Sequence, residues 1–262
     1  MKKLLIRAAV VVVSVFLLNL LKASPAFAVT SHCGTISADE TWSSAGNVHV
    51  VTCNVTVASG VTLTVTEGAI VKFNSGTALL IQGSLRVLGV EGNPVYFTSY
   101  RDDTIGGDTN GDGASTGARN DWSQIEFQDS SIDASSLIDH AVILHAGCCV
   151  YGGAIALVSA SPTIRNASIS NSQHGLYVSN STPVLACSDI YDNGDYGLYN
   201  ATTSVMVNAE NQWWSSASGP YHSTTNPTGT GDRVTSGVDY TPWRTSPCRV
   251  SQYTTFLPLI RR

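Results

Sequence analysis

An acidic stretch, GGDTNGDGAS at residues 106–115, places metal-binding side chains at alternate positions. Asp108, Asn110 and Asp112 are followed by Gly113, so their oxygens can turn toward one point while the glycine permits a sharp bend. Hard oxygen ligands in this pattern favour Ca²⁺ over zinc or copper. We therefore predict a calcium-binding loop whose ion has a structural rather than a catalytic role.

The remaining ligands of this loop have to come from its flanks. The calcium loop of helix–loop–helix proteins has a carboxylate at its twelfth position, where this chain has Arg119. We expect Asp121, two residues later, to replace it, and Asp102 or Asp103 to close the site from the upstream side. The alternative is a solvated turn without an ion, because Asp, Asn and Gly are also ordinary turn residues.

Tyrosines in the second half of the chain offer another kind of chemistry, which is contact with sugars. The candidates are Tyr177, Tyr191, Tyr196 and Tyr199, which recur in neighbouring sequence blocks such as HGLYV and YGLYN. Repeated rings on adjacent strands form a ladder in which each ring has an apolar body and a polar tip. The alternative is that they are ordinary outward-facing strand aromatics.

The first 28 residues have the layout of an export signal. Lys2, Lys3 and Arg7 precede an apolar run, which ends in a small-residue site, Ala26 to Ala28. We expect cleavage after Ala28 and a secreted or cell-surface protein. An uncleaved membrane anchor is the alternative, although the apolar run is short for a membrane span. No other segment of the chain is expected to cross a bilayer.

The charge of the exported chain limits its partners. Four of the 14 basic residues lie in the predicted signal, so the rest of the chain has a net charge of about −9 against 19 acidic residues. Such a surface repels phosphate backbones and anionic lipid, which makes nucleic acid an unexpected partner. Lys72 is the one lysine that remains, so we do not expect a phosphate-binding or Schiff-base site built on lysines.

Six cysteines remain after residue 28, and an even number in an exported chain favours disulfides over thiol chemistry. The pairing most readable from the sequence joins Cys33 to Cys53 and closes a loop at the N-terminal edge. The pairing of the other four stays open. Neighbouring cysteines such as Cys148 and Cys149 seldom pair with each other, so we do not expect that bond.

Two periodicities describe the elements that must position these residues. Residues 54–73 alternate Val or Leu with Thr and are interrupted by glycines, which predicts short strands and tight turns. Further on, similar blocks begin at Ser161, Thr182 and Thr203, a spacing of 21 residues. A period of this length made only of strands and turns predicts a solenoid. Neither the leucine-rich repeat signature nor a helical segment is present.

Within these blocks, positions one period apart are expected to stack on one another. Ile164, Leu185 and Met206 form one such column, and Ile169, Ile190 and Asn211 another. Roughly nine coils at the usual strand spacing would make a rod about 40 Å long.

Four motifs from Trp42 to Trp243 resemble those of bacterial secreted right-handed parallel β-helix proteins with the pectin-lyase-like fold. These motifs are SGVTLTVTEGAIVKF, GNPVYFTS, DDTIGGDTNGDG followed by NDW, and NQWWSSASGP followed by VDYTPW. The resemblance implies an all-β, right-handed, single-stranded parallel β-helix with capped ends. It identifies an architecture that supports many chemistries, among them polysaccharide lyases and glycoside hydrolases.

The sequence therefore predicts a signal peptide at 1–28, a β-helix at 29–248 and a tail at 249–262. Within the β-helix we expect an N-terminal cap at 29–58, the calcium-loop insertion at 101–121 and a C-terminal cap at 211–248, where Trp213 and Trp214 cover the last hydrophobic layer. The expected function is a monomeric extracellular binding or structural module for a polysaccharide or cell-surface glycan. The alternative is a polysaccharide lyase or glycoside hydrolase.

Overall fold

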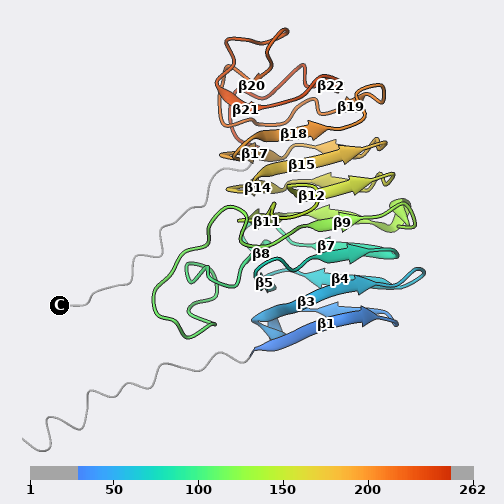
Figure 1. Cartoon of the computed structure of the whole chain (residues 1–262), viewed down its shortest axis with the longest axis vertical. Coiled ribbons are helices and arrows are strands. Elements are labelled where there is room, and N and C mark those ends of the chain that lie inside the picture. Colours follow the sequence, from blue (N-terminus) through green and yellow to red (C-terminus); the bar gives the residue numbers. More distant parts are fainter. Residues whose placement is uncertain (1–28, 249–262) are drawn as a thin grey trace, which may run out of the picture.

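A computed structural model describes residues 29–248, which wind into stacked rungs of β-strand (Figure 1). The predicted signal at 1–28 and the predicted tail at 249–262 lie outside the described residues. Within residues 29–248 there is no α-helix, and the helical content consists of two short 3-10 turns, Ser44–Gly46 (η1) and Asp133–Ser135 (η2). The chain is therefore an all-β protein, as its periodicity predicts.

The strands form three faces of the solenoid, and all their pairings are parallel. The long strands β1 (Thr30–Ile36) and β3 (His49–Val57) span faces 1 and 2. Face 1 continues with β5 (Ile70–Phe73), β8 (Val95–Ser99), β11 (Ala141–Leu144), β14 (Ser168–Ser170) and β17 (Asp189–Tyr191).

Face 2 continues with β6 (Leu79–Ile81), β9 (Ile125–Phe127), β12 (Gly153–Val158), β15 (His174–Ser179) and β18 (Tyr196–Asn200). Face 3 contains β2 (Glu40–Trp42), β4 (Thr62–Thr66), β7 (Ser84–Leu88), β10 (Leu137–Asp139), β13 (Thr163–Arg165) and β16 (Val184–Ala186). Successive strands of one face are separated by a complete turn of the chain. The fold is thus a parallel β-helix of about eight turns, close to the nine that the sequence predicts.

The 21-residue period places most of the predicted columns in register. Ile164 pairs with Leu185 on face 3, and Ile169 pairs with Ile190 on face 1. Tyr177 pairs with Tyr199 on face 2.

The period fails at the last predicted repeat. Met206 is 61% exposed and lies outside the core. In the other column, the residue that pairs with the β17 strand on the next rung is Trp213, which forms a bridge with Asp189, rather than Asn211. The connection after β18 changes the spacing, so the extrapolated columns are wrong at these two positions.

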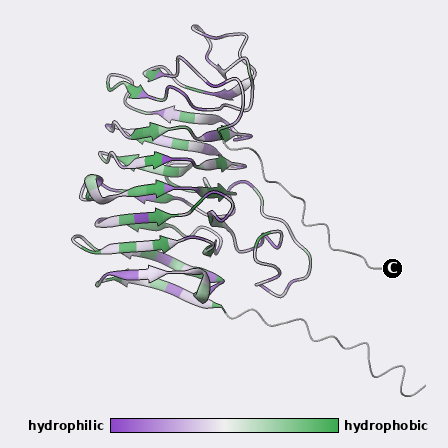
Figure 2. Cartoon of the chain, turned by 180° about the vertical axis from the view of Figure 1, so that it is seen from behind, coloured by the Kyte–Doolittle hydropathy of each residue, from purple (hydrophilic) through white to green (hydrophobic). Residues whose placement is uncertain are grey.

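Strand alternation builds one continuous core. In β4, the sequence TLTVT turns Leu63 and Val65 inward, where both are fully buried, while its threonines face outward. β-branched residues suit such a half-buried pleated surface. The buried cluster extends from Ile36 in β1 to Tyr240 near the end of the described chain. Figure 2 shows apolar residues recurring along the strands of successive rungs.

The region predicted as the N-terminal cap, 29–58, contains β1, β2 and β3, which pair in parallel with each other or with later strands. A histidine pair lies on this first rung. His49 Nε2 donates to the Ser43 carbonyl at 2.8 Å, and His32 Nε2 lies 2.9 Å from His49 Nδ1. His32 also stacks on Trp42, with ring centroids 4.0 Å apart. Both rings are therefore held in a largely buried site.

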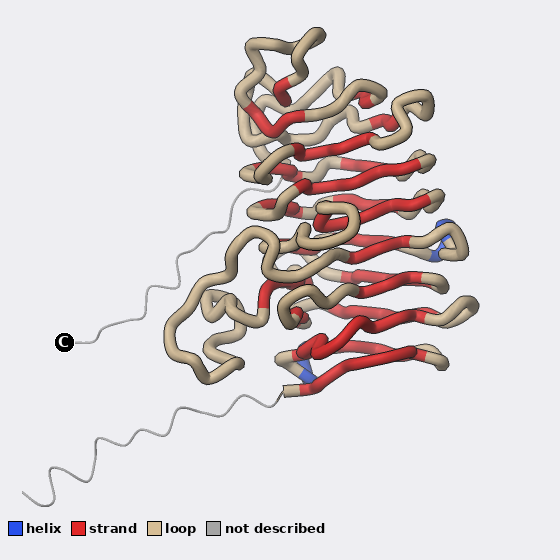
Figure 3. Tube along the Cα trace, in the orientation of Figure 1, coloured by secondary structure: helices blue, strands red, loops and turns tan. Residues whose placement is uncertain are grey.

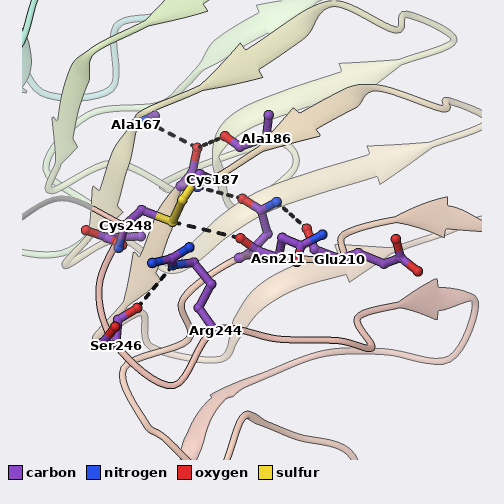
Figure 4. Close-up of a disulfide and its surroundings, with 11 residues drawn as sticks. Ala167, Ala186, Cys187, Glu210, Asn211, Arg244, Ser246 and Cys248 are labelled. Atoms are coloured by element: carbon purple, nitrogen blue, oxygen red, sulfur yellow. Dashed lines mark hydrogen bonds between the residues drawn. A yellow bond between two sulfur atoms is a disulfide. The ribbon is translucent and has the colours of Figure 1, made fainter.

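The region predicted as the C-terminal cap, 211–248, contains short strands and a buried Trp214 that extends the core. These strands are β20 (Pro220–Tyr221), β21 (Gly231–Arg233) and β22 (Val238–Asp239), with β19 (Val207–Asn208) just before them. The segment is joined to the solenoid by the Cys187–Cys248 disulfide, beside which the Asn211 carbonyl and Arg244 lie (Figure 4).

Disulfides pair all six cysteines of the described chain. The Cys33–Cys53 bond is confirmed, and Cys187 pairs with Cys248 across 61 residues. In the loop-closure model these two bonds stabilise the fold by about 3 and 4 kcal/mol. The expectation that Cys148 and Cys149 do not pair is wrong, because the structure joins these neighbours to each other. Because Cys33 pairs with Cys53 and Cys187 pairs with Cys248, Cys148 and Cys149 are the two cysteines that remain.

Among residues 29–248 there is no helical segment with the length and apolarity that a bilayer crossing requires.

The histidine pair gives the first rung a pH dependence. Burial and the neighbouring His49 together lower the pKa of His32 to about 4, against an opposing effect of Glu40. The unfolded chain therefore binds a proton more readily than the folded chain between pH 6.5 and about 4, so stability is lost as the pH falls through this window. Burial raises the pKa of Asp232 to about 6, which has the opposite effect below pH 6.

We predict that His32→Gln removes the His32 contribution to this acid sensitivity. Between pH 7 and pH 4 the parent chain should lose about 2 kcal/mol more unfolding free energy than the variant. Urea unfolding at each pH measures the difference, with Asp232→Asn as the control that changes the slope in the other direction. Parallel pH profiles for the parent and His32→Gln would contradict the assignment.

Candidate functional site

The predicted calcium loop leaves the solenoid after β8 and returns before β9, at the corner between faces 1 and 2. It projects sideways from the rungs as a long irregular segment (Figure 3). One part of it lies close to face 1, since a Cβ atom on Gly106 would come within 3.4 Å of Val48 and Ile70 side chains. The segment predicted as an insertion, 101–121, lies within this connection between β8 and β9.

Three of the predicted ligands come together in this loop. Asp103, Asp108 and Asp112 each offer a carboxylate oxygen, and these oxygens lie within 4.8 Å of one another. Asp108 accepts hydrogen bonds from the amides of Gly111 and Gly113, which folds the D-x-N-x-D-G turn around it.

The other predicted ligands are placed differently. Asn110 lies in the same turn and accepts from the Asp112 amide at 3.4 Å. Asp102 is buried outside the cluster, where it accepts from Thr98 Oγ1 at 2.6 Å and from Thr104. Asp121 accepts from Ser99 Oγ at 2.7 Å and from the Ala118 amide. Of the two upstream candidates, Asp103 therefore joins the cluster and Asp102 anchors the base of the loop.

Asp103 has an incomplete set of partners. Its Oδ2 accepts from the amide and hydroxyl of Ser115, at 2.7 and 3.1 Å. Its Oδ1 is buried and has no hydrogen-bond partner among the described residues. A buried carboxylate oxygen without a partner costs free energy. The donor set, which is hard, anionic and partly unpaired, fits a divalent cation such as Ca²⁺.

Lys72 on β5 contacts the acidic loop, and this contact was not predicted from the sequence. Its side chain is fully buried beneath the loop, and its ammonium donates to the Gly107 carbonyl at 2.7 Å and to Thr109 Oγ1 at 2.9 Å. Burial lowers the pKa of Lys72, while the nearby carboxylates of Asp102, Asp103 and Asp108 raise it. The sequence feature that could have indicated this contact is a single lysine within the otherwise apolar strand IVKF.

A pocket of about 480 Å³ lies between this loop and the solenoid. Its lining includes Asp112, Asp121, Arg101 and Tyr100, together with Asn74 at the end of β5. Arg101 Nη1 lies 3.8 Å from Asp121 Oδ1. The pocket thus combines two carboxylates and a guanidinium on an open surface beside the acidic cluster.

Three of the four predicted tyrosines gather on face 2. Tyr177 on β15 and Tyr199 on β18 stack with centroids 5.8 Å apart, and Tyr196 meets Tyr199 edge-on at 5.2 Å. Tyr191 lies on β17 of face 1, where its hydroxyl is 3.3 Å from Ser168 Oγ. The ladder is therefore formed by Tyr177, Tyr196 and Tyr199, without Tyr191.

Further groups extend this ladder and were missed from sequence. Tyr151 packs on Tyr177 at 4.8 Å, and His174 stacks on Tyr199 at 5.3 Å. Arg233 lies over the Tyr196 ring at 5.1 Å. We call Tyr151, His174, Tyr177, Tyr196, Tyr199 and Arg233 the tyrosine patch. Its five rings are half-buried, and the four tyrosine hydroxyls make no hydrogen bond to another residue in the range 29–248.

The polar side chains at the end of β10 form hydrogen bonds with one another. Arg165 donates to Asp139 through Nε at 2.9 Å, and Asn166 donates to the same carboxylate at 2.9 Å. Burial alone would raise the pKa of Asp139, but the hydrogen bonds from Asn166 and Arg165 outweigh it and hold this pKa below its ordinary value. Arg165 thus forms an ion pair with Asp139 on the neighbouring rung, which links the two rungs.

Comparison with protein-family models, with curated proteins and with solved structures finds no match to this chain. The parallel β-helix is shown by the structure itself, while the resemblance to the pectin-lyase-like fold and the handedness of the coil stay predictions.

Proposed function

We propose that this protein is an exported, calcium-stabilised β-helix that binds glycans outside the cell. The observation that carries the proposal is the tyrosine patch, in which four phenolic hydroxyls without a hydrogen-bond partner among residues 29–248 lie beside half-exposed rings on consecutive rungs. The partner class is an extracellular polysaccharide or a cell-surface glycan.

The chemistry of the patch suits sugars. A sugar ring has apolar C–H surfaces edged by hydroxyls, and a tyrosine combines an apolar ring with a group that both donates and accepts hydrogen bonds. Tyr177 and Tyr199 stack on each other, so they present ring edges and hydroxyl tips rather than two free faces. Arg233 adds donors at the C-terminal end of the patch.

The acidic cluster supports the calcium part of the proposal. Asp103, Asp108 and Asp112 repel one another at their observed separation, and Lys72 bonds to a carbonyl and a hydroxyl rather than to these carboxylates. A divalent ion bound by the three groups would remove the repulsion and give Asp103 Oδ1 a partner. The ion would fix the loop against face 1 without taking part in binding sugar.

Export is supported by two independent features. The first 28 residues have the composition of a signal peptide. All six later cysteines are paired, which is typical of proteins that fold in an oxidising compartment.

Removal of calcium should lower the stability of the protein. We expect a melting temperature about 5–10 °C lower in EGTA than in millimolar CaCl₂, because an ion bound only by the folded state stabilises it by mass action. Asp112→Asn should abolish most of this difference. Asp129→Asn changes the charge equally at an exposed position outside the loop and should retain it. Equal melts in EGTA and CaCl₂ would refute a structural ion.

Truncation of the patch should weaken glycan binding. After a glycan array identifies the preferred oligosaccharide, Tyr177→Ala and Tyr199→Ala should each raise its Kd about tenfold in calorimetric titrations. Tyr191→Ala is the matched control, because that ring lies on face 1, and it should leave the Kd unchanged. An array without binding, or equal losses in all three variants, would oppose the proposal.

A second candidate function rests on the 480 Å³ pocket. Arg101, Asp112 and Asp121 line it together. On an open face, a glycoside hydrolase needs at least two carboxylates, and a polysaccharide lyase needs at least a carboxylate with a guanidinium. This arrangement would place the reaction next to the acidic loop rather than on the tyrosine patch.

Activity assays separate the two candidates. If the binding function is correct, pectins, alginates and other uronans incubated with the protein and Ca²⁺ should yield no unsaturated or shortened products. Products that disappear in Arg101→Ala and Asp121→Asn, but persist in the exposed control Arg86→Ala, would establish the enzymatic function instead.

A further inference from the structure

The segment that carries the Cys148–Cys149 bond is an insertion at the corner between faces 1 and 2. It runs through residues 145–152, from β11 to β12. On the next two rungs the same corner is turned by the shorter segments 171–173 and 192–195. The added length therefore serves something other than the change of face.

The Cys148–Cys149 bond contributes little to holding the solenoid together. It closes a ring through a single peptide bond, whereas the other two disulfides span 20 and 61 residues. The entropy that a cross-link removes from the unfolded chain grows with the length of the closed loop. The fold can thus tolerate opening of this bond far better than opening of the other two.

The backbone and exposure of the pair favour its opening. Cys149 has a φ of 78°, in the left-handed region that residues other than glycine rarely adopt. Cys149 is exposed, and the next residue, Val150, is 74% exposed. Disulfides that are accessible and hold an unfavourable backbone are more easily reduced and are often regulatory.

The bond lies at the start of a short stretch that ends in the tyrosine patch. Cys148 is fixed on one side, because its amide donates to the Trp122 carbonyl at 3.1 Å. Gly152 is fixed on the other, because its carbonyl accepts from the His174 amide at 2.7 Å. Between these anchors lie Cys149, Val150 and Tyr151, and the Tyr151 ring packs on Tyr177.

We propose that Cys148 and Cys149 form a thiol–disulfide exchange site for a reducing dithiol, and that its redox state controls whether Tyr151 is part of the tyrosine patch. In the disulfide form the ring closure holds Tyr151 against Tyr177. In the dithiol form Cys149 leaves the left-handed conformation and Tyr151 separates from Tyr177. The binding readout of this inference rests on the proposed glycan function, whereas its chemical and structural readouts do not.

The exchange is an ordinary two-electron reaction. A thiolate of the dithiol attacks the sulfur of the exposed residue Cys149, so the Cys148–Cys149 bond breaks, a mixed disulfide forms and Cys148 leaves as a thiolate that takes up a proton. The second thiol of the reagent then attacks its own mixed sulfur and releases Cys149 as a thiol. The dithiol ends as its cyclic or intramolecular disulfide, having given two electrons and two protons to the protein.

Graded reduction tests the exchange site. The folded protein is treated with increasing dithiothreitol, alkylated and mapped by mass spectrometry. Cys148 and Cys149 should become alkylated at a reagent concentration at least tenfold below that needed for the other four cysteines, with little change in melting temperature. Simultaneous opening of all three disulfides, or earlier opening of Cys33–Cys53 or Cys187–Cys248, would overturn the proposal.

Two measurements on the selectively reduced protein test the control of Tyr151. NMR cross-peaks between the Tyr151 and Tyr177 rings, assigned with Tyr151→Phe, should vanish on reduction and return on reoxidation. Cys148→Ser/Cys149→Ser should reproduce the reduced spectrum. Cross-peaks that persist in the reduced protein would overturn the switch.

Glycan affinity provides the last readout. Reduction should weaken binding about fivefold in the parent chain, match the effect of Tyr151→Ala, and have no further effect in that variant. Affinity that is unchanged by reduction would overturn the regulatory role while leaving the proposed glycan function in place. If no glycan binds at all, the proposed function fails, and the alkylation and NMR results still decide the exchange site.

Discussion

The parallel hydrogen-bond ladder is the constraint on which this molecule depends. Each inner strand bonds to the rung before it and the rung after it, so inward side chains one turn apart must stack in register. A single extra residue inside a strand moves the apolar set that follows it to the other face. Insertions are therefore confined to the corners, where the ladder is already interrupted.

Two insertions use the same corner, between faces 1 and 2, on consecutive turns. The first forms the acidic loop, which folds back toward face 1, and the second bears the Cys148–Cys149 pair and reaches face 2 through Tyr151. Arg119, at the end of the acidic loop, also donates to the Asp192 carbonyl three rungs further on. The groups of the proposed sites thus lie at this corner and on face 2 beside it, where β15 and β18 carry Tyr177 and Tyr199.

The sequence predicted the parts of the structure that repeat. Alternation and the 21-residue period identified the solenoid, because every rung meets the same physical demand and so has a similar pattern, as Ile164 and Leu185 illustrate. The D-x-N-x-D-G spacing located the acidic turn for a related reason, since its contacts are local in the chain. The Cys33–Cys53 pair was readable because those residues lie one turn apart on neighbouring strands.

Contacts between a strand and an insertion could not be predicted in this way. The bond from Lys72 to Gly107 joins residues 35 apart, and its existence depends on how the loop folds back rather than on any repeat. Tyr151 was missed because it lies outside the strand blocks in which the other tyrosines recur. The periodicity also does not predict that the spacing changes after β18. Because of this change, Met206 lies outside the core.

The enclosure of Lys72 has a chemical consequence for the whole described surface. No other lysine occurs after residue 28, and this one has no exposed area. Acylating reagents that modify accessible ε-amines therefore have no lysine target on residues 29–248 while the acidic loop stays closed. Acylation of Lys72 thus requires the loop to move away from its ammonium, so the extent of modification reports how accessible the closed loop leaves this amine.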